Sequence, residues 1–151
     1  MKQTFRFDYE HYDSLELLSV EDRELIDAAR GALSGAHPDF SNFRVGAAAR
    51  LASGKIVIGS NQESEVFPAT MCAERTLLYH HQATMADDHI KALAIVSSPG
   101  ERECYPCGQC RQVLRDVEKR QGADFKVIMC SNTSASVVRR ATDLLPFTFE
   151  L

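Results

Sequence analysis

The stretch CYPCGQCRQVLRDVEKRQGADFKVIMC, residues 104–130, decides the class of fold. Val113, Leu114 and Val117 fall on one helical face, and Gly122 lies where a glycine commonly ends a helix. The apolar run that follows the glycine, DFKVIMC, predicts a buried strand. A helix that passes through one turn into a buried strand is typical of α/β proteins.

The same alternation extends toward both ends of the chain. Ser19 and Asp22 predict a capping box that starts a helix ending near Gly35, and another helix is expected from about Cys72. Short apolar runs predict four further strands, at residues 44–52, 55–61, 91–98 and 135–140. The sequence therefore predicts a layered α/β sandwich around a mostly buried sheet.

A length of 151 residues suits one domain with its own core. Residues 1–18 alternate aromatic and charged side chains without a clear period, so we expect an N-terminal arm that docks on the body. Residues 19–151 are expected to form the single domain, because they contain no repeat, low-complexity tract or linker.

The composition indicates which kinds of partner and which compartment to expect. The net charge is −4, and the 17 basic residues are scattered among 21 acidic ones, so we expect no nucleic-acid partner and a small substrate instead. No apolar run is long enough for a membrane span, and the N-terminal residues MKQTFRFDYE lack the apolar core of a secretory signal. Five clustered cysteines fit reduced thiols in a cytoplasmic protein better than a disulfide framework.

Three of the cysteines are candidate metal ligands. Cys72 and Cys107 each stand at an expected helix N-terminus, where the helix dipole and free amides favour thiolates, and Cys110 follows one turn later. Four interpretations remain open from this spacing. They are a closed structural zinc site that adds Cys104, a redox pair, unrelated core cysteines, and an open site with three thiolates.

Glu74 favours the open site. It lies two residues beyond Cys72 on the first turn of the expected helix, and positions i and i+2 do not share a helix face. We therefore expect Glu74 not to bind the ion held by Cys72 but to reach water in an open coordination position.

The motifs CAE (72–74) and PCGQC (106–110) together resemble the zinc deaminase signature. With SNFRVGAAA, GSNQE, FPATMCAERT and LLPFTF in order, the chain from about Ser41 to Phe149 resembles the small three-cysteine cytidine deaminases. The resemblance implies a three-layer α/β/α sandwich with a five-stranded mixed sheet. It also implies one zinc ion per subunit, held by Cys72, Cys107 and Cys110.

The same resemblance implies a reaction. Glu74 would carry protons from water to the cytosine ring and to the departing amine, while Arg75 would donate to cysteine sulfur and offset the charge of three thiolates. The product would be uridine or deoxyuridine, with ammonia released.

The resemblance also assigns a pocket for a small-molecule nucleoside. Asn61 and Glu63 would bind the sugar hydroxyls, Phe43 would pack against the nucleoside, and the backbone amide of Ala73 and carbonyl of Tyr105 would meet the base. Phe149 would be lent to a neighbouring subunit, which makes the enzyme a homotetramer with shared active sites.

Three residues depart from the usual family pattern. Arg44 stands where Pro is common, Ser64 where Asn is common, and Tyr105 where Ser is common. Tyr105 would act through its backbone carbonyl, but its side chain could narrow or reshape the pocket. Two rival functions remain. One is a deaminase of another cytosine nucleoside, such as a blasticidin-like antibiotic, and the other is a zinc-stabilised structural protein with a closed four-cysteine site.

Overall fold

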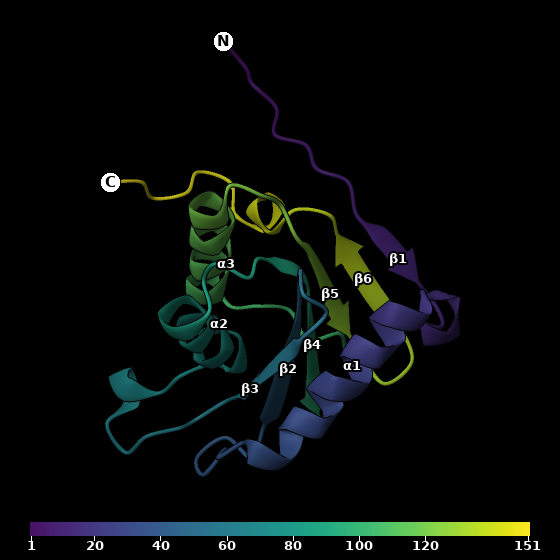
Figure 1. The fold of residues 1–151 in the computed structure, drawn as a ribbon, viewed down its shortest axis with the longest axis vertical. Helices are drawn as coiled ribbons and strands as arrows, with labels where there is room; N and C mark the ends of the chain where they lie inside the picture. Colours follow the sequence, from purple (N-terminus) through teal and green to yellow (C-terminus); the bar gives the residue numbers. More distant parts are fainter.

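A computed structural model describes residues 1–151 and contains one mixed sheet of six strands (Figure 1). The strand order is β1-β6-β5-β4-β2-β3, and only β4 and β5 are parallel neighbours. The strands are β1 (Glu10–Tyr12), β2 (Arg44–Leu51), β3 (Ile56–Ser60), β4 (Ile90–Ser98), β5 (Lys126–Cys130) and β6 (Ala135–Val138).

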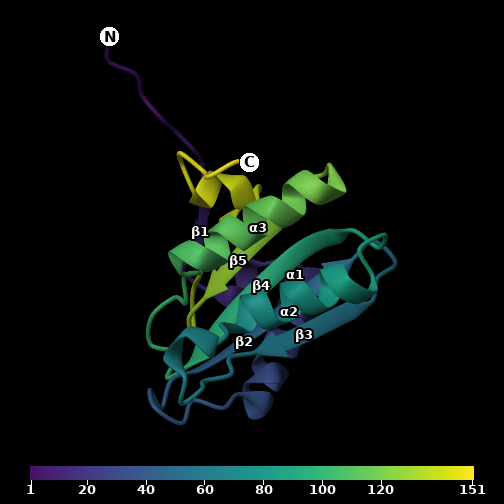
Figure 2. The same cartoon turned by 90° about the vertical axis from the view of Figure 1, so that its left-hand side faces the viewer.

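Helices cover both faces of this sheet, which confirms the three-layer α/β/α sandwich. Helix α1 (Val20–Ala32) packs on one face, and α2 (Ala73–Thr84) and α3 (Gly108–Gln121) lie side by side on the other (Figure 2). Successive strand residues alternate between the two cores, since Ala47 and Ala49 join the α2–α3 side while Ala48 joins the α1 side. Strand β2 is thus buried on both faces.

The sheet has six strands rather than the five predicted, because β1 comes from the segment expected to be an arm. Residues Glu10–Tyr12 pair antiparallel with β6, and Leu15 N donates to Thr133 O at 3.1 Å. Residues 1–9 form no helix or strand, and their N-terminal end points away from the body (Figure 1). A three-residue strand is too short to show a period-two pattern, so no local pattern predicts it.

The predicted capping box is half formed. Ser19 Oγ accepts from the backbone N–H of Asp22 at 3.2 Å, so Ser19 caps α1 as expected. The side chain of Asp22 does not complete the box, because its carboxylate binds Lys126 Nζ on β5 at 2.6 Å. The α1 start is therefore tied to the sheet, and Gly122 ends α3 with φ of 65° as predicted.

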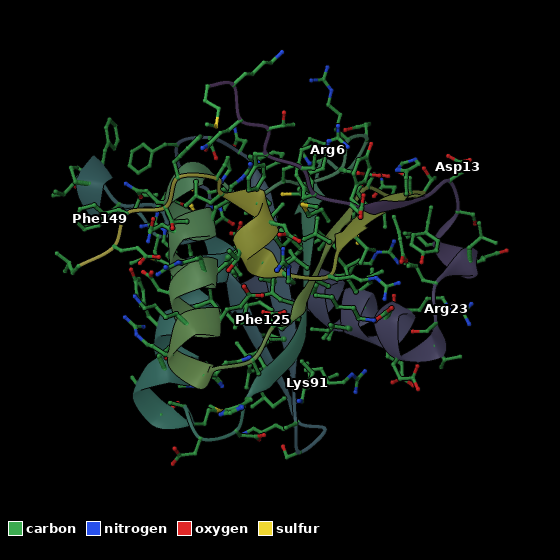
Figure 3. The ribbon with its side chains drawn as sticks, turned by 90° about the horizontal axis from the view of Figure 1, so that it is seen from above. Arg6, Asp13, Arg23, Lys91, Phe125 and Phe149 are labelled. Atoms are coloured by element: carbon green, nitrogen blue, oxygen red, sulfur yellow. The ribbon has the colours of Figure 1, made fainter.

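A buried carboxylate fixes the end of α3 to the last segment of the chain. Glu118 accepts four hydrogen bonds, from the backbone N–H groups of Phe125, Ala141 and Thr142 and from the hydroxyl of Thr142, at 2.5–3.1 Å. Phe125 itself is fully buried and lies beside α3 in Figure 3. Four donors satisfy the charge of a carboxylate that would otherwise be costly to bury.

Replacing Glu118 should therefore weaken the fold. We expect Glu118→Gln to lower the free energy of unfolding by about 2–4 kcal/mol, because an amide nitrogen would face donors that need an acceptor. The measurement is urea denaturation, with the exposed Glu16→Gln as the control that should stay within about 0.5 kcal/mol of the parent. Equal losses in the two variants would contradict this role of Glu118.

Candidate metal centre and substrate site

Three cysteine sulfurs meet where α2 and α3 begin. Cys72 is the N-cap residue of α2, Cys107 is the N-cap residue of α3, and Cys110 lies one turn into α3. The Sγ atoms of Cys72 and Cys107 are 3.8 Å apart, those of Cys107 and Cys110 are 3.5 Å apart, and all three lie within 4.8 Å of one another. The predicted ligand set is thus brought together in space.

Packing against the sheet places these helix ends. Gly59 of β3 lies so close to the start of α2 that a Cβ on this residue would approach Ala73 O to 2.7 Å. A side chain at this position would push the first turn of α2 away from the sheet. The glycine therefore allows Cys72 to reach the start of α3.

The Cys72 thiol is poised to lose its proton. The pKa of Cys72 is lowered to about 5, first by the hydrogen bond from Cys110 and next by the Arg75 guanidinium, whose Nη2 lies 3.4 Å from Cys72 Sγ. The pKa of Cys110 is raised, because this thiol donates to Cys72 and is buried. A metal ion that binds the cluster takes the place of the remaining thiol protons, which are released, and the sulfurs become its ligands.

Arg75 supplies a test of whether this cluster fits zinc. Its Nε is buried without a hydrogen-bond partner, although its Nη2 contacts a ligand sulfur. A guanidinium beside three cysteines offsets the negative charge that three thiolates would bring to the ion. Sulfur donors in a tight cluster suit zinc, so the residues present fit the metal.

Cys104 stands outside the cluster. Its backbone N–H donates to Cys130 O at 3.0 Å, its side chain packs against the core, and burial raises the pKa of its thiol to about 12. All five cysteines are free, and the sulfurs that could hold a metal come from three of them. The arrangement favours the open three-cysteine interpretation over the closed four-cysteine site.

This difference gives a direct prediction. Cys104→Ala should leave the zinc content at about one ion per chain, because its sulfur is not in the cluster. The measurement is metal analysis by mass spectrometry after dialysis. Loss of zinc from this variant, with the far-ultraviolet circular dichroism unchanged, would support the closed four-cysteine interpretation instead.

Glu74 lies on the first turn of α2 and is only 4% exposed. Burial raises the pKa of its carboxyl to about 7, and the Cys72 charge adds to the rise. A carboxyl that titrates near neutrality can accept and return protons under the same conditions. The structure therefore places a buried carboxyl that titrates near neutrality beside the clustered sulfurs. Its role in proton transfer stays a prediction.

A cavity of about 390 Å³ borders the segment of residues 101–105 that leads toward α3. Its lining includes Phe43 and Tyr105, two of the residues expected to touch substrate, together with Ser97 and Cys104. Ala73 is the first residue of α2, so its N–H has no acceptor within the helix and is available to a ligand. The volume lies within the range of small-molecule pockets.

Asn61 and Glu63 already have partners in the chain. Asn61 Oδ1 accepts from Val45 N and Nδ2 donates to Phe43 O, both at 2.8 Å, so this amide holds the Phe43 backbone in place. Glu63 accepts from Phe40 N at 2.7 Å and from both the N–H and the hydroxyl of Ser41. These bonds lower the pKa of the Glu63 carboxyl, with the Ser41 hydroxyl as the largest cause. Sugar binding by the two residues stays a prediction.

The departures from the family pattern have structural explanations. Arg44 Nη1 donates to Leu33 O and Ala36 O, which joins the start of β2 to the end of α1. Ser64 Oγ accepts from Val66 N, and its N–H donates to Thr70 Oγ1, so the loop before α2 is held by side chains. Tyr105 donates its hydroxyl to Glu103, which raises the pKa of the tyrosine.

Phe149 belongs to the C-terminal segment of the chain. The C-terminal segment runs along α3, where Gln112 Nε2 donates to Phe149 O at 3.2 Å, and Figure 3 shows Phe149 on the opposite side of the molecule from Asp13. The residue is 69% exposed. Its aromatic ring is thus not covered by this chain.

Two positions near the site had no signal in the sequence. Ser41 binds Glu63 and also accepts from Phe43 N at 3.0 Å, and Glu103 is a buried carboxylate beside Tyr105. A serine in a loop and a glutamate before a cysteine are ordinary surface residues by composition, so only tertiary structure identifies them.

A sandwich that brings three cysteine sulfurs and a buried glutamate to two helix N-termini is the arrangement of a zinc-dependent deaminase. The family model for the cytidine and deoxycytidylate deaminase zinc-binding region matches residues 19–122. The chain belongs to this family.

Individual relatives agree with this assignment. The chain is 35% identical over 125 residues to a cytidine deaminase of Halalkalibacterium halodurans, and the match covers 83% of this chain and 91% of the relative. It is 36% identical over 125 residues to a probable cytidine deaminase of Dictyostelium discoideum, and the match covers 82% of this chain and 80% of the relative. The crystal structure of a Burkholderia pseudomallei cytidine deaminase superposes with a TM-score of 0.71 at 34% identity, covering 84% of this chain and 98% of that one.

Proposed function

We propose that this protein hydrolyses cytidine and deoxycytidine, with water, to uridine and deoxyuridine plus ammonia. The observation that carries the proposal is a buried Glu74 whose carboxyl interacts with Cys72 and Cys110 of the three clustered sulfurs. The family assignment and the likeness to named cytidine deaminases support the choice of reaction.

Cys72, Cys107 and Cys110 would hold the zinc ion. Zinc in such a site acts as a Lewis acid that makes water a better nucleophile near neutral pH. Arg75 would stabilise the ligand charge through its contact with Cys72 Sγ. The two helix N-termini add positive potential at the same sulfurs.

Glu74 would move the protons. Its buried carboxylate would take one proton from the attacking water and deliver it to the ring nitrogen beside the reacting carbon. It would then take the second proton from the oxygen now bonded to that carbon and pass it to the departing amine, which leaves as ammonia. Because Glu74 is shielded from solvent, its carboxyl can hold the proton between these steps. The overall reaction exchanges an amine for a carbonyl oxygen and needs no oxidant or reductant.

The remaining residues would hold the nucleoside. Phe43 and Tyr105 line the cavity, the free N–H of Ala73 would donate to the base carbonyl, and the Tyr105 carbonyl would accept from the base. Asn61 and Glu63 would face the sugar hydroxyls while they keep the loop of Phe43 and Ser41 in shape.

We also propose a homotetramer in which Phe149 of one subunit completes the pocket of another. The exposed aromatic rings of Phe147 and Phe149 support this, because one chain leaves both uncovered. We place the enzyme in the cytoplasm, in pyrimidine salvage, since its site needs reduced thiols. No helix in the structure has the length and apolar character needed to cross a membrane.

An ultraviolet assay of the zinc-loaded protein with cytidine, deoxycytidine and free cytosine tests the proposal. We expect both nucleosides to lose the absorbance of the cytosine ring and free cytosine to react far more slowly. Turnover of free cytosine alone would remove the proposed roles of Asn61 and Glu63. Turnover of a blasticidin-like nucleoside without turnover of cytidine would show that the proposed substrate is wrong and that the proposed reaction is right.

A further inference from the structure

A second buried carboxylate joins segments that are distant in the sequence. The side chain of Glu103 is 7% exposed and precedes the Cys104–Pro106 segment that leads into α3. One carboxylate oxygen accepts from Ser134 Oγ at 2.8 Å, in the turn between β5 and β6. The same oxygen lies 3.5 Å from His11 Nδ1 of β1. Glu103 is therefore fixed from two sides by elements outside its own loop.

The other carboxylate oxygen holds Tyr105. Tyr105 Oη donates to Glu103 Oε2 at 3.0 Å, while the tyrosine as a whole is 57% exposed. An exposed tyrosine can turn about two side-chain bonds, so one hydrogen bond to an immobile acceptor decides where its ring rests.

Tyr105 is the wall between two cavities. On one side it lines the 390 Å³ cavity with Phe43 and Cys104, and on the other it lines a cavity of about 490 Å³ with Phe7 and Tyr9 of the N-terminal segment. A rotation of the ring would enlarge one cavity and reduce the other. Its orientation therefore sets the width of the candidate substrate site.

We propose that Glu103 is a positioning residue that sets substrate binding by holding the Tyr105 ring as a wall of the substrate cavity. The inference rests on the proposed function, because it assigns the substrate to that cavity. No hydrogen bond or ion pair joins Glu103 to Glu74 or to the three clustered cysteines. It therefore acts on the fit of the nucleoside in the ground state and the transition state alike, which changes KM rather than kcat.

Steady-state kinetics with cytidine test this assignment in four variants. Glu103→Ala and Tyr105→Phe should each raise KM by about 5–20-fold with kcat within about twofold of the parent. The double variant should be no worse than Glu103→Ala alone, because both changes remove the same hydrogen bond. Glu103→Gln keeps an acceptor for Tyr105 and should restore KM to within about threefold of the parent.

The controls separate this proposal from a loss of structure and from the proposed function. Glu16→Ala, at an exposed position in the segment before α1, should leave both constants unchanged. Tyr105→Phe removes one oxygen from an exposed side chain, so it keeps the test valid even where Glu103→Ala folds poorly. Additive KM effects, an unchanged KM in Tyr105→Phe, or a fall in kcat alone would overturn the positioning role. A parent enzyme without cytidine turnover would overturn the proposed function as well.

Discussion

Glu74→Gln should lower turnover of cytidine by about 10²–10⁴-fold while the protein keeps its fold and its zinc. Glutamine has nearly the same shape as glutamate but cannot accept and return a proton at neutral pH. Because Glu74 is buried on the first turn of α2, the substitution leaves the three sulfurs in place. The measurements are kcat in the ultraviolet assay and zinc content per chain.

The result is informative only with zinc measured on the same sample. A variant that loses both turnover and zinc would show that Glu74 supports the metal site rather than proton transfer. A variant that keeps zinc and more than about a tenth of the turnover would remove Glu74 from the mechanism.

The same substitution should stabilise the metal-free protein above neutral pH, although it lowers turnover. Folding raises the pKa of the Glu74 carboxyl from 4.5 to about 7, so the folded state holds this proton more tightly than the unfolded chain does. Wild-type stability therefore falls as the pH rises from about 4.5 to about 7, by up to about 3 kcal/mol. Metal-free Glu74→Gln should be the more stable protein at pH 8, and its advantage should shrink toward pH 5 in urea titrations.

Cys110→Ala should abolish stable zinc binding and turnover together. Cys110 is buried and its sulfur lies 3.5 Å from Cys107 Sγ, so its removal takes one of three donors from the cluster. Loss of a residue that only hydrogen-bonds to a metal ligand weakens metal binding by about 10–100-fold. Loss of a direct ligand is expected to weaken zinc binding by more than this. Zinc content after dialysis against a weak chelator measures the effect.

Cys130→Ala provides the matched control. Cys130 is as buried as Cys110 but lies on β5, outside the group of sulfurs that could hold a metal. It should lose some stability through a small cavity and keep its zinc. Equal zinc loss in the two variants would mean that the Cys110 result reflects unfolding.

The parts of this structure that follow from local sequence were predictable. Cys72 and Cys107 were expected at helix N-termini, and both are N-cap residues of α2 and α3. The alternation of β2 between two cores, and the end of α3 at Gly122, likewise depend on neighbours in the chain. Hydrophobic periodicity and turn chemistry act over a few residues, so a sequence records them directly.

The parts that depend on distant partners were not predictable. Asp22 was expected to complete a capping box, but Lys126, more than a hundred residues away, takes its carboxylate. Glu103 binds Ser134, and β1 exists only because β6 offers it an edge. A short strand or a buried acid acquires its partner through the fold, and no local pattern announces it.

The central claim is that three sulfurs, and not four, hold the metal beside Glu74. X-ray absorption at the zinc edge of the loaded wild-type protein counts the sulfur neighbours of the ion directly. The account predicts three sulfur scatterers per zinc, with the same count in Cys104→Ala. Four sulfur scatterers in the wild type would contradict it, since a closed site leaves the metal no position at which to assist the reaction.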